Sequence, residues 1–277
     1  MNNTRIRWRA LIFPGLSCLY LALIYGLPTA AALSMWRVER WTAPVAPAAW
    51  IVVFLVVAGV LSRPHQASVR PGKFRRDLND PDYFHRRLYG LCWTAVCYNT
   101  PAYYICLSIP VLKWLTFRLF GYRGSMNFTV YPDTWIRDLP LLEFEDGVYV
   151  SNRATLGTNI VLGNGTLLVG GIKLRRDALV GHLAVLGPGV EMEADSEVGV
   201  GAAIGLRAKL RHGAVVGARC GIAHGVSVGR NVTIGPHSYV DSAAIIQDDV
   251  HLPARSTVAS RSVVRADTDS EARRACA

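Results

Sequence analysis

The chain has 277 residues with 30 Lys and Arg against 20 Asp and Glu, a formal net charge of +10. All of this excess lies in residues 1–140, where 16 basic residues face 6 acidic ones, whereas residues 141–277 hold 14 of each. No nucleic-acid-binding motif accompanies the basic half, so we expect anionic lipid headgroups as its partner and not nucleic acid. The six cysteines show neither paired spacing nor metal-ligand motifs, which gives no support for a disulfide framework.

Two uncharged apolar segments, residues 10–36 and 43–62, are each long enough to cross a bilayer. Three arginines precede the first segment and seven basic residues follow the second closely, while the loop between them holds two arginines beside one glutamate. The positive-inside rule therefore predicts a transmembrane hairpin with both flanks in the cytoplasm. The first segment is too long for a secretory signal, and a second span follows almost at once.

A third uncharged stretch, residues 88–112, is broken by Asn99-Thr100-Pro101 and by Pro110 into pieces of about ten residues. Pieces of that length favour interfacial or re-entrant helices, and the next segment mixes aromatic and basic residues as a helix at a headgroup surface does. We predict a membrane domain over residues 1–124, with a basic segment at 63–87 and interfacial or re-entrant helices at 88–122. A third span over 88–112 is the alternative.

After a connector at 125–143, residues 144–264 repeat with a period of six. An apolar residue opens each of 21 blocks without an insertion, and the fifth position of each block is small or β-branched. Glycine follows the opening residue in nine blocks, and Asn-Gly, Pro-Gly or His-Gly pairs occupy several third and fourth positions, where left-handed backbone is easiest for glycine. This pattern predicts short strands separated by turns, rather than a helix or an ordinary strand.

Three such strands make one coil of 18 residues, so residues 18 apart become vertical neighbours. The expected fold class is mainly β, a parallel β-helix of about seven coils and roughly 33 Å in height, preceded by an α-helical membrane domain. The tail at 265–277 is polar, aperiodic and predicted to be flexible.

The pattern aliphatic-Gly-x-x-small-x resembles the hexapeptide-repeat acyltransferases, whose fold is a left-handed parallel β-helix. The resemblance covers residues 144–264 and implies a homotrimer with active sites in the clefts between subunits. It also implies an acyl donor held as a thioester on coenzyme A or on an acyl carrier protein. Carbonic anhydrases and the tails of sugar nucleotidyltransferases share the same repeat.

Acyl transfer from a thioester needs a base that takes the proton of the attacking hydroxyl or amine. His182, His212 and His224 occupy third positions of blocks, and His237 a fourth, at corners where side chains point outward. The segment IAHGVSVG around His224 resembles the IAH segment of UDP-N-acetylglucosamine acyltransferases, which implies a general-base role for His224. Gly225 stands where those enzymes have Asp or Asn, and their carboxyl-terminal helices are absent from this sequence.

The spacing of 18 places Asp241 and Ser242 against His224, where Asp241 could fix the tautomer of the ring. His182, with Asn164 expected one coil below it, is the second candidate base. The alternative for any corner histidine is a solvated turn residue without a catalytic role.

Arg219, His237 and Arg255 are spaced by 18 on one corner, roughly 5 Å apart. Like charges this close repel unless a counter-ion is supplied, so we expect the column to bind the phosphates of coenzyme A or an acidic patch of a carrier protein. The alternative is three solvated cations that spread apart.

The same residues bear on other functions of hexapeptide-repeat proteins. A hexapeptide-repeat carbonic anhydrase would need a second histidine five residues after a corner histidine, where Gly187, Gly217 and Gly229 stand, so we expect no metal site. The uninterrupted period predicts no long loop between coils, which argues mildly against the xenobiotic and serine acetyltransferases. The layout also resembles, loosely, terminal regions of certain peptide synthetases.

The sequence therefore predicts a multi-pass acyltransferase in a bacterial inner (cytoplasmic) membrane, with its β-helix in the cytoplasm and a small-molecule or lipid-linked acceptor. A non-catalytic trimeric scaffold of a biosynthesis or export complex is the main alternative.

Overall fold

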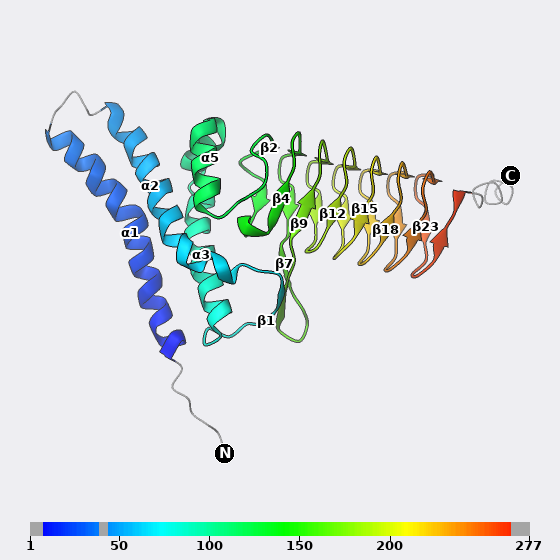
Figure 1. The fold of residues 1–277 in the computed structure, drawn as a ribbon, viewed down its shortest axis with the longest axis horizontal. Helices are drawn as coiled ribbons and strands as arrows, with labels where there is room; N and C mark the ends of the chain where they lie inside the picture. Colours follow the sequence, from blue (N-terminus) through cyan, green and yellow to red (C-terminus); the bar gives the residue numbers. More distant parts are fainter. Residues whose placement is uncertain (1–7, 39–43, 267–277) are drawn as a thin grey trace, which may run out of the picture. The chain divides into compact units, whose positions relative to one another are not determined.

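The computed structural model describes residues 8–38 and 44–266, and the chain divides into two compact units (Figure 1). The first unit comprises three segments, Met1–Tyr122, Asp138–Pro140 and Leu162–Leu167. The second unit comprises Arg123–Arg137, Leu141–Val161 and Leu168–Ala277. The loop between the two predicted spans and nearly all of the predicted tail lie outside the described residues.

The first unit begins with two apolar helices, α1 (Trp8–Val38) and α2 (Ala46–Ser62), and a 3-10 helix η2 (Arg63–Ser68) follows α2 directly. By length and composition alone, the two helices are able to cross a membrane. They coincide closely with the two segments predicted to span. Most of the apolar surface of α1 is exposed, which suits a helix that faces lipid.

The third apolar stretch forms helices that end where the prolines and Asn99 predict. A short strand, β1 (Gly72–Arg75), precedes them. The helices are α3 (Pro81–Tyr98), α4 (Thr100–Ser108) and α5 (Pro110–Leu119). None of the three is among the helices long and apolar enough to cross a membrane. Their placement at a membrane surface stays a prediction.

An aromatic core holds α3, α4 and α5 together. Trp93 is buried and packs edge-on against Tyr103, Phe117 and Phe120 at centroid distances of 4.9–6.0 Å. Such edge-to-face pairs add to the free energy gained from burying the rings. These short helices therefore share a protein core of their own.

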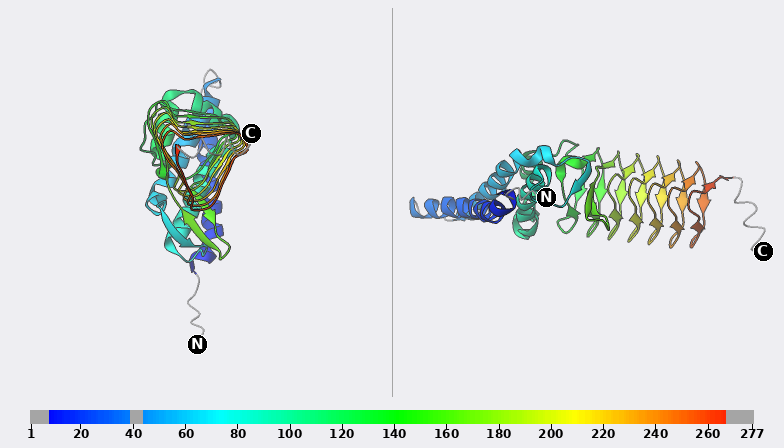
Figure 2. Two further views of the ribbon diagram at one scale, coloured as in Figure 1. Left: turned by 90° about the vertical axis from the view of Figure 1, so that its right-hand side faces the viewer. Right: turned by 90° about the horizontal axis from the view of Figure 1, so that it is seen from below.

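The second unit is a three-sided parallel β-helix built from three sheets of seven strands each, as the hexapeptide period predicts (Figure 2). The β2 sheet contains β2 (Thr129–Val130), β5 (Tyr149–Val150), β10 (Leu179–Val180), β13 (Glu197–Val198), β16 (Val215–Val216), β19 (Thr233–Ile234) and β22 (His251–Leu252). The β3 sheet contains β3 (Trp135–Ile136), β6 (Thr155–Leu156), β11 (Val185–Leu186), β14 (Ala203–Ile204), β17 (Gly221–Ile222), β20 (Tyr239–Val240) and β23 (Thr257–Val258). The β4 sheet contains β4 (Leu142–Phe144), β9 (Ile172–Leu174), β12 (Glu191–Met192), β15 (Lys209–Leu210), β18 (Ser227–Val228), β21 (Ile245–Ile246) and β24 (Val263–Val264).

The stacking follows the predicted spacing of 18 residues, as in the pairs Leu179↔Glu197 and Val185↔Ala203. The opening residues of the blocks, such as Leu186 and Val216, are fully buried, and the small fifth residues, such as Ala184, are buried beside them. The backbone N–H and C=O groups of the three strands in each coil form hydrogen bonds with the coils above and below. Seven coils result, which is the predicted number, although the residues that form them differ in part from those predicted.

Away from the residues near 159–171, the corners are formed by the fourth residue of each block, which adopts a left-handed backbone. Twelve of these residues are not glycine, and their φ angles lie between 53° and 64°. They are Arg153, Asp177, Leu183, Asp195, Arg207, Arg219, Asn231, His237, Ala243, Asp249, Arg255 and Arg261. Each non-glycine residue there costs roughly 1–2 kcal/mol, which the stacking offsets. The left-handed requirement thus falls on the fourth position and not on the third.

The β-helix begins earlier than predicted. Its first strands, β2 and β3, lie inside residues 125–143, which the sequence analysis treats as a connector. This first coil was missed because eight residues, instead of six, separate Ile136 from Phe144, which breaks the period.

The expectation of an uninterrupted repeat is wrong. Between β6 and β9 the chain leaves the coil as a hairpin of β7 (Asn159–Val161) and β8 (Thr166–Val169). Leu162 and Leu168, which continue the period, are only partly buried, whereas Leu167 and Val169 are buried. Because the excursion adds twelve residues, two whole blocks, the period of six continues through it and conceals it.

Candidate functional site

The candidate site residues lie on the corners of the β-helix. We name each corner after its third-position histidine. The His182 corner joins the β2 sheet to the β3 sheet, the His224 corner joins the β3 sheet to the β4 sheet, and the His212 corner joins the β4 sheet to the β2 sheet. The three candidate bases are therefore on three different corners of one prism.

His224 is held by the backbone of the coil below it. The Leu206 N–H donates a hydrogen bond of 3.0 Å to His224 Nδ1. An imidazole nitrogen that accepts a hydrogen bond carries no proton, so the neutral ring has its proton on Nε2. The exposed Nε2 of His224 is thus a hydrogen-bond donor in this arrangement.

Asp241 lies one coil above, but its carboxylate has another partner. The expected stacking of the two coils is present, since the Ala243 N–H donates to the His224 carbonyl at 2.9 Å. Asp241 Oδ1 accepts from the N–H of Ser242 at 2.6 Å. Among the described residues no hydrogen bond or ion pair joins Asp241 to the His224 ring, so the tautomer is set by Leu206 instead.

His182 is half-buried, and its carbonyl accepts from the Gly201 N–H at 2.8 Å. Its ring makes no hydrogen bond or ion pair within residues 8–38 and 44–266. Asn164, expected one coil below, lies in the β7–β8 hairpin instead, and Asn152 takes that place through a hydrogen bond from Leu183 N–H to its carbonyl at 3.1 Å. Either ring nitrogen of His182 is available to a substrate.

His212 has the acidic neighbour that the sequence analysis assigned to His224. Its Nδ1 lies 3.5 Å from Asp195 Oδ2, and its N–H donates to Glu193 Oε2 at 3.0 Å. Burial raises the pKa of Glu193, but the hydrogen bonds from Arg211 and from the His212 N–H outweigh it and lower that pKa. The 17-residue spacing from Asp195 to His212 was the sequence signal for this pair.

Arg219, His237 and Arg255 form the expected column on the His182 corner. The His237 and Arg255 N–H groups each donate 2.9 Å hydrogen bonds to the coil below, and all three residues have left-handed backbones. Their side chains are exposed, and in the part of the chain that the structure describes they have no ion-pair partner. Whether the column binds a donor stays a prediction.

The outer face of the β3 sheet is a feature that the sequence analysis missed. Its outward residues carry no charge in any coil: Trp135, Thr155, Val185, Ala203, Gly221, Tyr239 and Thr257. Val185 and Tyr239 are 44% and 48% exposed. These outward residues occupy the sixth position of every third block. The sequence shows that they form one uncharged face only after the blocks have been assigned to the three sheets.

The β4 sheet is the opposite in character. Lys173 and Lys209 flank Glu191 at 3.4 and 3.5 Å, so its outer face carries a ladder of ion pairs in the early coils. Charged groups of this kind remain solvated, whereas the uncharged face of the β3 sheet, on which Trp135, Val185 and Tyr239 are exposed, is a candidate interaction surface. The His182 and His224 corners both border the uncharged face, and the His212 corner does not.

A family model described as bacterial transferase hexapeptide (six repeats) matches residues 207–242. This stretch holds five candidate residues: His212, Arg219, His224, His237 and Asp241. No curated protein matches the chain.

Two solved serine acetyltransferases align with the chain. Serine acetyltransferase 1 of Entamoeba histolytica, in complex with L-cysteine, is 8% identical over 84% of this chain and 74% of its own, with a TM-score of 0.22. Serine acetyltransferase of Neisseria gonorrhoeae, in complex with serine, is 12% identical over 83% of this chain and 91% of its own, with a TM-score of 0.20. Similarities this low carry no argument about function.

Proposed function

We propose, from the bacterial transferase hexapeptide repeats at residues 207–242, that this chain is an acyltransferase. It transfers an acyl group from a thioester of coenzyme A or of an acyl carrier protein to a hydroxyl or amine. The observation that carries this proposal is the pair of corner histidines beside the uncharged face of a hexapeptide-repeat β-helix.

His182 acts as the general base, because its ring has both nitrogens available. It takes the proton of the acceptor hydroxyl or amine as that atom attacks the thioester carbonyl. The C–S bond then breaks, and the thiolate leaves with the proton that His182 returns. His224 lies on another corner and two coils further along the β-helix, so its Nε2–H, fixed by Leu206, donates a hydrogen bond to a group of the bound substrates away from the reacting carbonyl.

Asp241 has a positioning role, because its carboxylate accepts the Ser242 N–H and so holds the turn that stacks on His224. The column of Arg219, His237 and Arg255 holds the donor, either by the phosphates of coenzyme A or by an acidic surface of a carrier protein. Guanidinium groups suit this role because their planar donors match phosphate and carboxylate oxygens.

The uncharged β3 sheet face supports a homotrimer. Contact between copies would cover the exposed side chains of Trp135, Val185 and Tyr239, and a threefold arrangement would place the His182 and His224 corners at the edges of the contact. Sites built at those edges would draw residues from two subunits.

Helices α1 and α2 anchor the chain in a bacterial inner membrane, and the β-helix stays in the cytoplasm, where acyl thioesters are made. The acceptor is then a small molecule or a lipid-linked group near the membrane.

The test uses the full chain purified in detergent, with acetyl- and longer acyl-coenzyme A, acyl carrier protein thioesters and a bacterial lipid extract. We expect His182→Ala to lower the rate of thioester consumption about 10²–10⁴-fold. His224→Ala should raise the KM of the substrate several-fold with little change in kcat, whereas His224→Gln keeps a donor near the Nε2 position and should leave the KM nearly unchanged.

His212→Ala is the matched control and should leave the rate unchanged, because His212 lies on the corner away from the β3 sheet. Loss of activity in His224→Gln with an unaffected His182→Ala would assign the base to His224. No consumption of any thioester by the unmodified chain would contradict the acyltransferase and favour a trimeric scaffold.

A further inference from the structure

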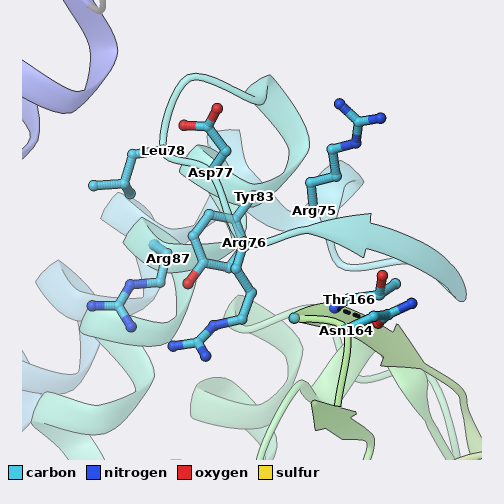
Figure 3. A pocket seen from close by; sticks show the side chains of 9 residues that line it. Arg75, Arg76, Asp77, Leu78, Tyr83, Arg87, Asn164 and Thr166 are labelled. Carbon is cyan, nitrogen blue, oxygen red and sulfur yellow. Dashed lines mark hydrogen bonds between the residues drawn. The ribbon is translucent and has the colours of Figure 1, made fainter. Parts of the chain in front are cut away.

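A cavity of about 680 Å³ opens in the first unit (Figure 3). It is lined by residues at the end of β1 and just after it, on the first turns of α3 and at the tip of the β7–β8 hairpin, among them Arg75, Arg76, Tyr83, Arg87, Asn164 and Thr166. The guanidinium groups of Arg76 and Arg87 and the hydroxyl of Tyr83 point to the same side in Figure 3, whereas Arg75 points away.

The cavity has more basic than acidic groups. Its one carboxylate, Asp77, accepts from the backbone N–H and the side-chain amide of Asn79 at 3.0 and 2.8 Å. Arg76 and Arg87 form no ion pair or hydrogen bond within the described ranges. Guanidinium groups gathered without acidic partners repel one another, so an anion placed among them is stabilised.

Nearby arginines in the same unit have carboxylate partners. Arg70 pairs with Asp82 at 2.7 Å, and the buried Arg86 pairs with Asp138. The arginines of the cavity therefore differ from their neighbours in lacking a carboxylate partner, and not in residue type.

The hairpin tip adds neutral donors. Asn164 Oδ1 accepts from the Thr166 N–H at 3.0 Å, which leaves the two hydrogens of the Asn164 amide as donors. Gly165 has a φ of 78°, a left-handed conformation that lets the loop turn tightly at this point. Arginine, tyrosine, amide and hydroxyl groups together make a lining rich in donors.

We propose that this cavity binds a phosphate or diphosphate group carried on a lipid. A guanidinium group donates two parallel hydrogen bonds to the oxygens of one phosphate. One arginine can therefore bind a single phosphate, and a second arginine suits a diphosphate. The volume falls in the range of small-molecule sites, so it holds the phosphate together with the first atoms of whatever the phosphate carries.

The position of the cavity supports a lipid as the carrier. The Arg87 guanidinium lies 5.8 Å from the centre of the Phe13 ring on α1, and Arg9 Nη1 donates to the Asn79 carbonyl at 3.2 Å. Phe13 and Arg9 lie at the amino-terminal end of α1, which is long and apolar enough to cross a membrane. Phosphate groups of lipids lie at that level of a bilayer.

This inference deepens the proposed function, because it identifies the acceptor as a phosphorylated lipid. The role of the ligand as acyl acceptor rests on the proposed function, whereas its binding in the cavity does not. Binding is measured without an acyl donor, so a failure of the cavity and a failure of acyl transfer give different results.

The experiment measures lipid retention by the detergent-purified full chain, using native mass spectrometry. The probes are phosphatidic acid, which exposes a phosphate monoester, phosphatidylglycerol, which has a diester, and inorganic diphosphate as a soluble competitor. We expect phosphatidic acid to be retained in preference to phosphatidylglycerol and to be displaced by diphosphate. Arg76→Gln/Arg87→Gln should weaken its retention about tenfold or more.

Arg70→Gln/Lys73→Gln removes the same charge outside the cavity and should retain phosphatidic acid as the unmodified chain does. If the double cavity variant does not fold, Asn164→Asp puts a carboxylate into the lining and keeps the acceptor for Thr166 N–H; it should weaken retention as well. Diphosphate that stabilises the protein while neither lipid is retained would assign the site to free phosphates and overturn the lipid. Equal retention by cavity and control variants would overturn the site itself.

Discussion

Arg86 and Arg87 are adjacent residues of α3 with opposite environments. Arg86 is 5% exposed and paired with Asp138, which is 1% exposed, whereas Arg87 faces the cavity. A charge buried with its partner is tolerated, but removal of one partner leaves the other charge in a medium that solvates it poorly. The pair therefore holds α3 to the segment that contains Asp138 within the first unit.

Asp138→Asn should destabilise the chain by about 3–5 kcal/mol, because it leaves the Arg86 charge buried. Asparagine tolerates the φ of 55° at this position, so the backbone is not the cause. Thermal unfolding in detergent measures the effect, and Arg86→Met added to Asp138→Asn should restore much of the loss. Asp82→Asn, which breaks the exposed pair with Arg70, should cost less than about 1 kcal/mol. Equal shifts for the two Asp→Asn variants would contradict this account.

The corner histidines show the limit of sequence prediction at this scale. The period of six correctly placed His182, His212 and His224 on corners and stacked residue 224 under residue 242. It could not indicate which hydrogen bond each ring makes, because the Nδ1 of His224 is engaged by a backbone N–H and every residue type supplies one. The neighbour of His182 was wrong because Asn164 lies in a hairpin that the period conceals.

At the scale of elements, the repeat predicted most of the β-helix but not its two departures. The first coil was missed because two extra residues before Phe144 shift the period. The β7–β8 hairpin was missed because its length is a multiple of six. The period gives only the position of a residue within its block of six. An insertion of twelve residues leaves that position unchanged for every later residue, so the repeat does not reveal it.

Leu168 and Leu186 occupy equivalent positions in the sequence period and different positions in the structure. Leu186 is 0% exposed inside the coil, while Leu168 is partly exposed in the hairpin. Leu186→Ala should cost about 2–5 kcal/mol through lost burial and a cavity, and Leu168→Ala less than about 1 kcal/mol. Urea unfolding followed by circular dichroism compares them. Similar costs would mean that the repeat runs through residue 168 without a hairpin.

At the scale of the whole molecule, the three sheets of the prism differ in their outer surfaces. The β4 sheet carries ion pairs, and the β3 sheet carries only uncharged side chains from Trp135 to Thr257. In the proposed homotrimer, a second and a third copy of the chain would cover the uncharged face of the β3 sheet.

Val185→Glu/Tyr239→Glu places charge on the uncharged face, and we expect it to convert a trimer into a monomer of 30.3 kDa. Both side chains point outward and are about half exposed, so the coil itself should fold. Ser227→Glu on the β4 sheet is the control and should leave the trimer intact. Light scattering in detergent gives the protein mass, and an unchanged mass in the double variant would exclude this face as the interface.

The β7–β8 hairpin has one more consequence. If residues 159–170 were absent, Gly157, Thr158, Gly171, Ile172 and Lys173 would join Leu156 to Leu174 as one ordinary block, with a glycine at the corner and an aliphatic residue pointing inward. The prism would close over the gap, while Asn164 and Thr166 would be lost from the phosphate cavity. The segment that contributes to ligand binding is thus distinct from the blocks that form the coils. The sequence of the hairpin could be changed without changing the repeat of the β-helix.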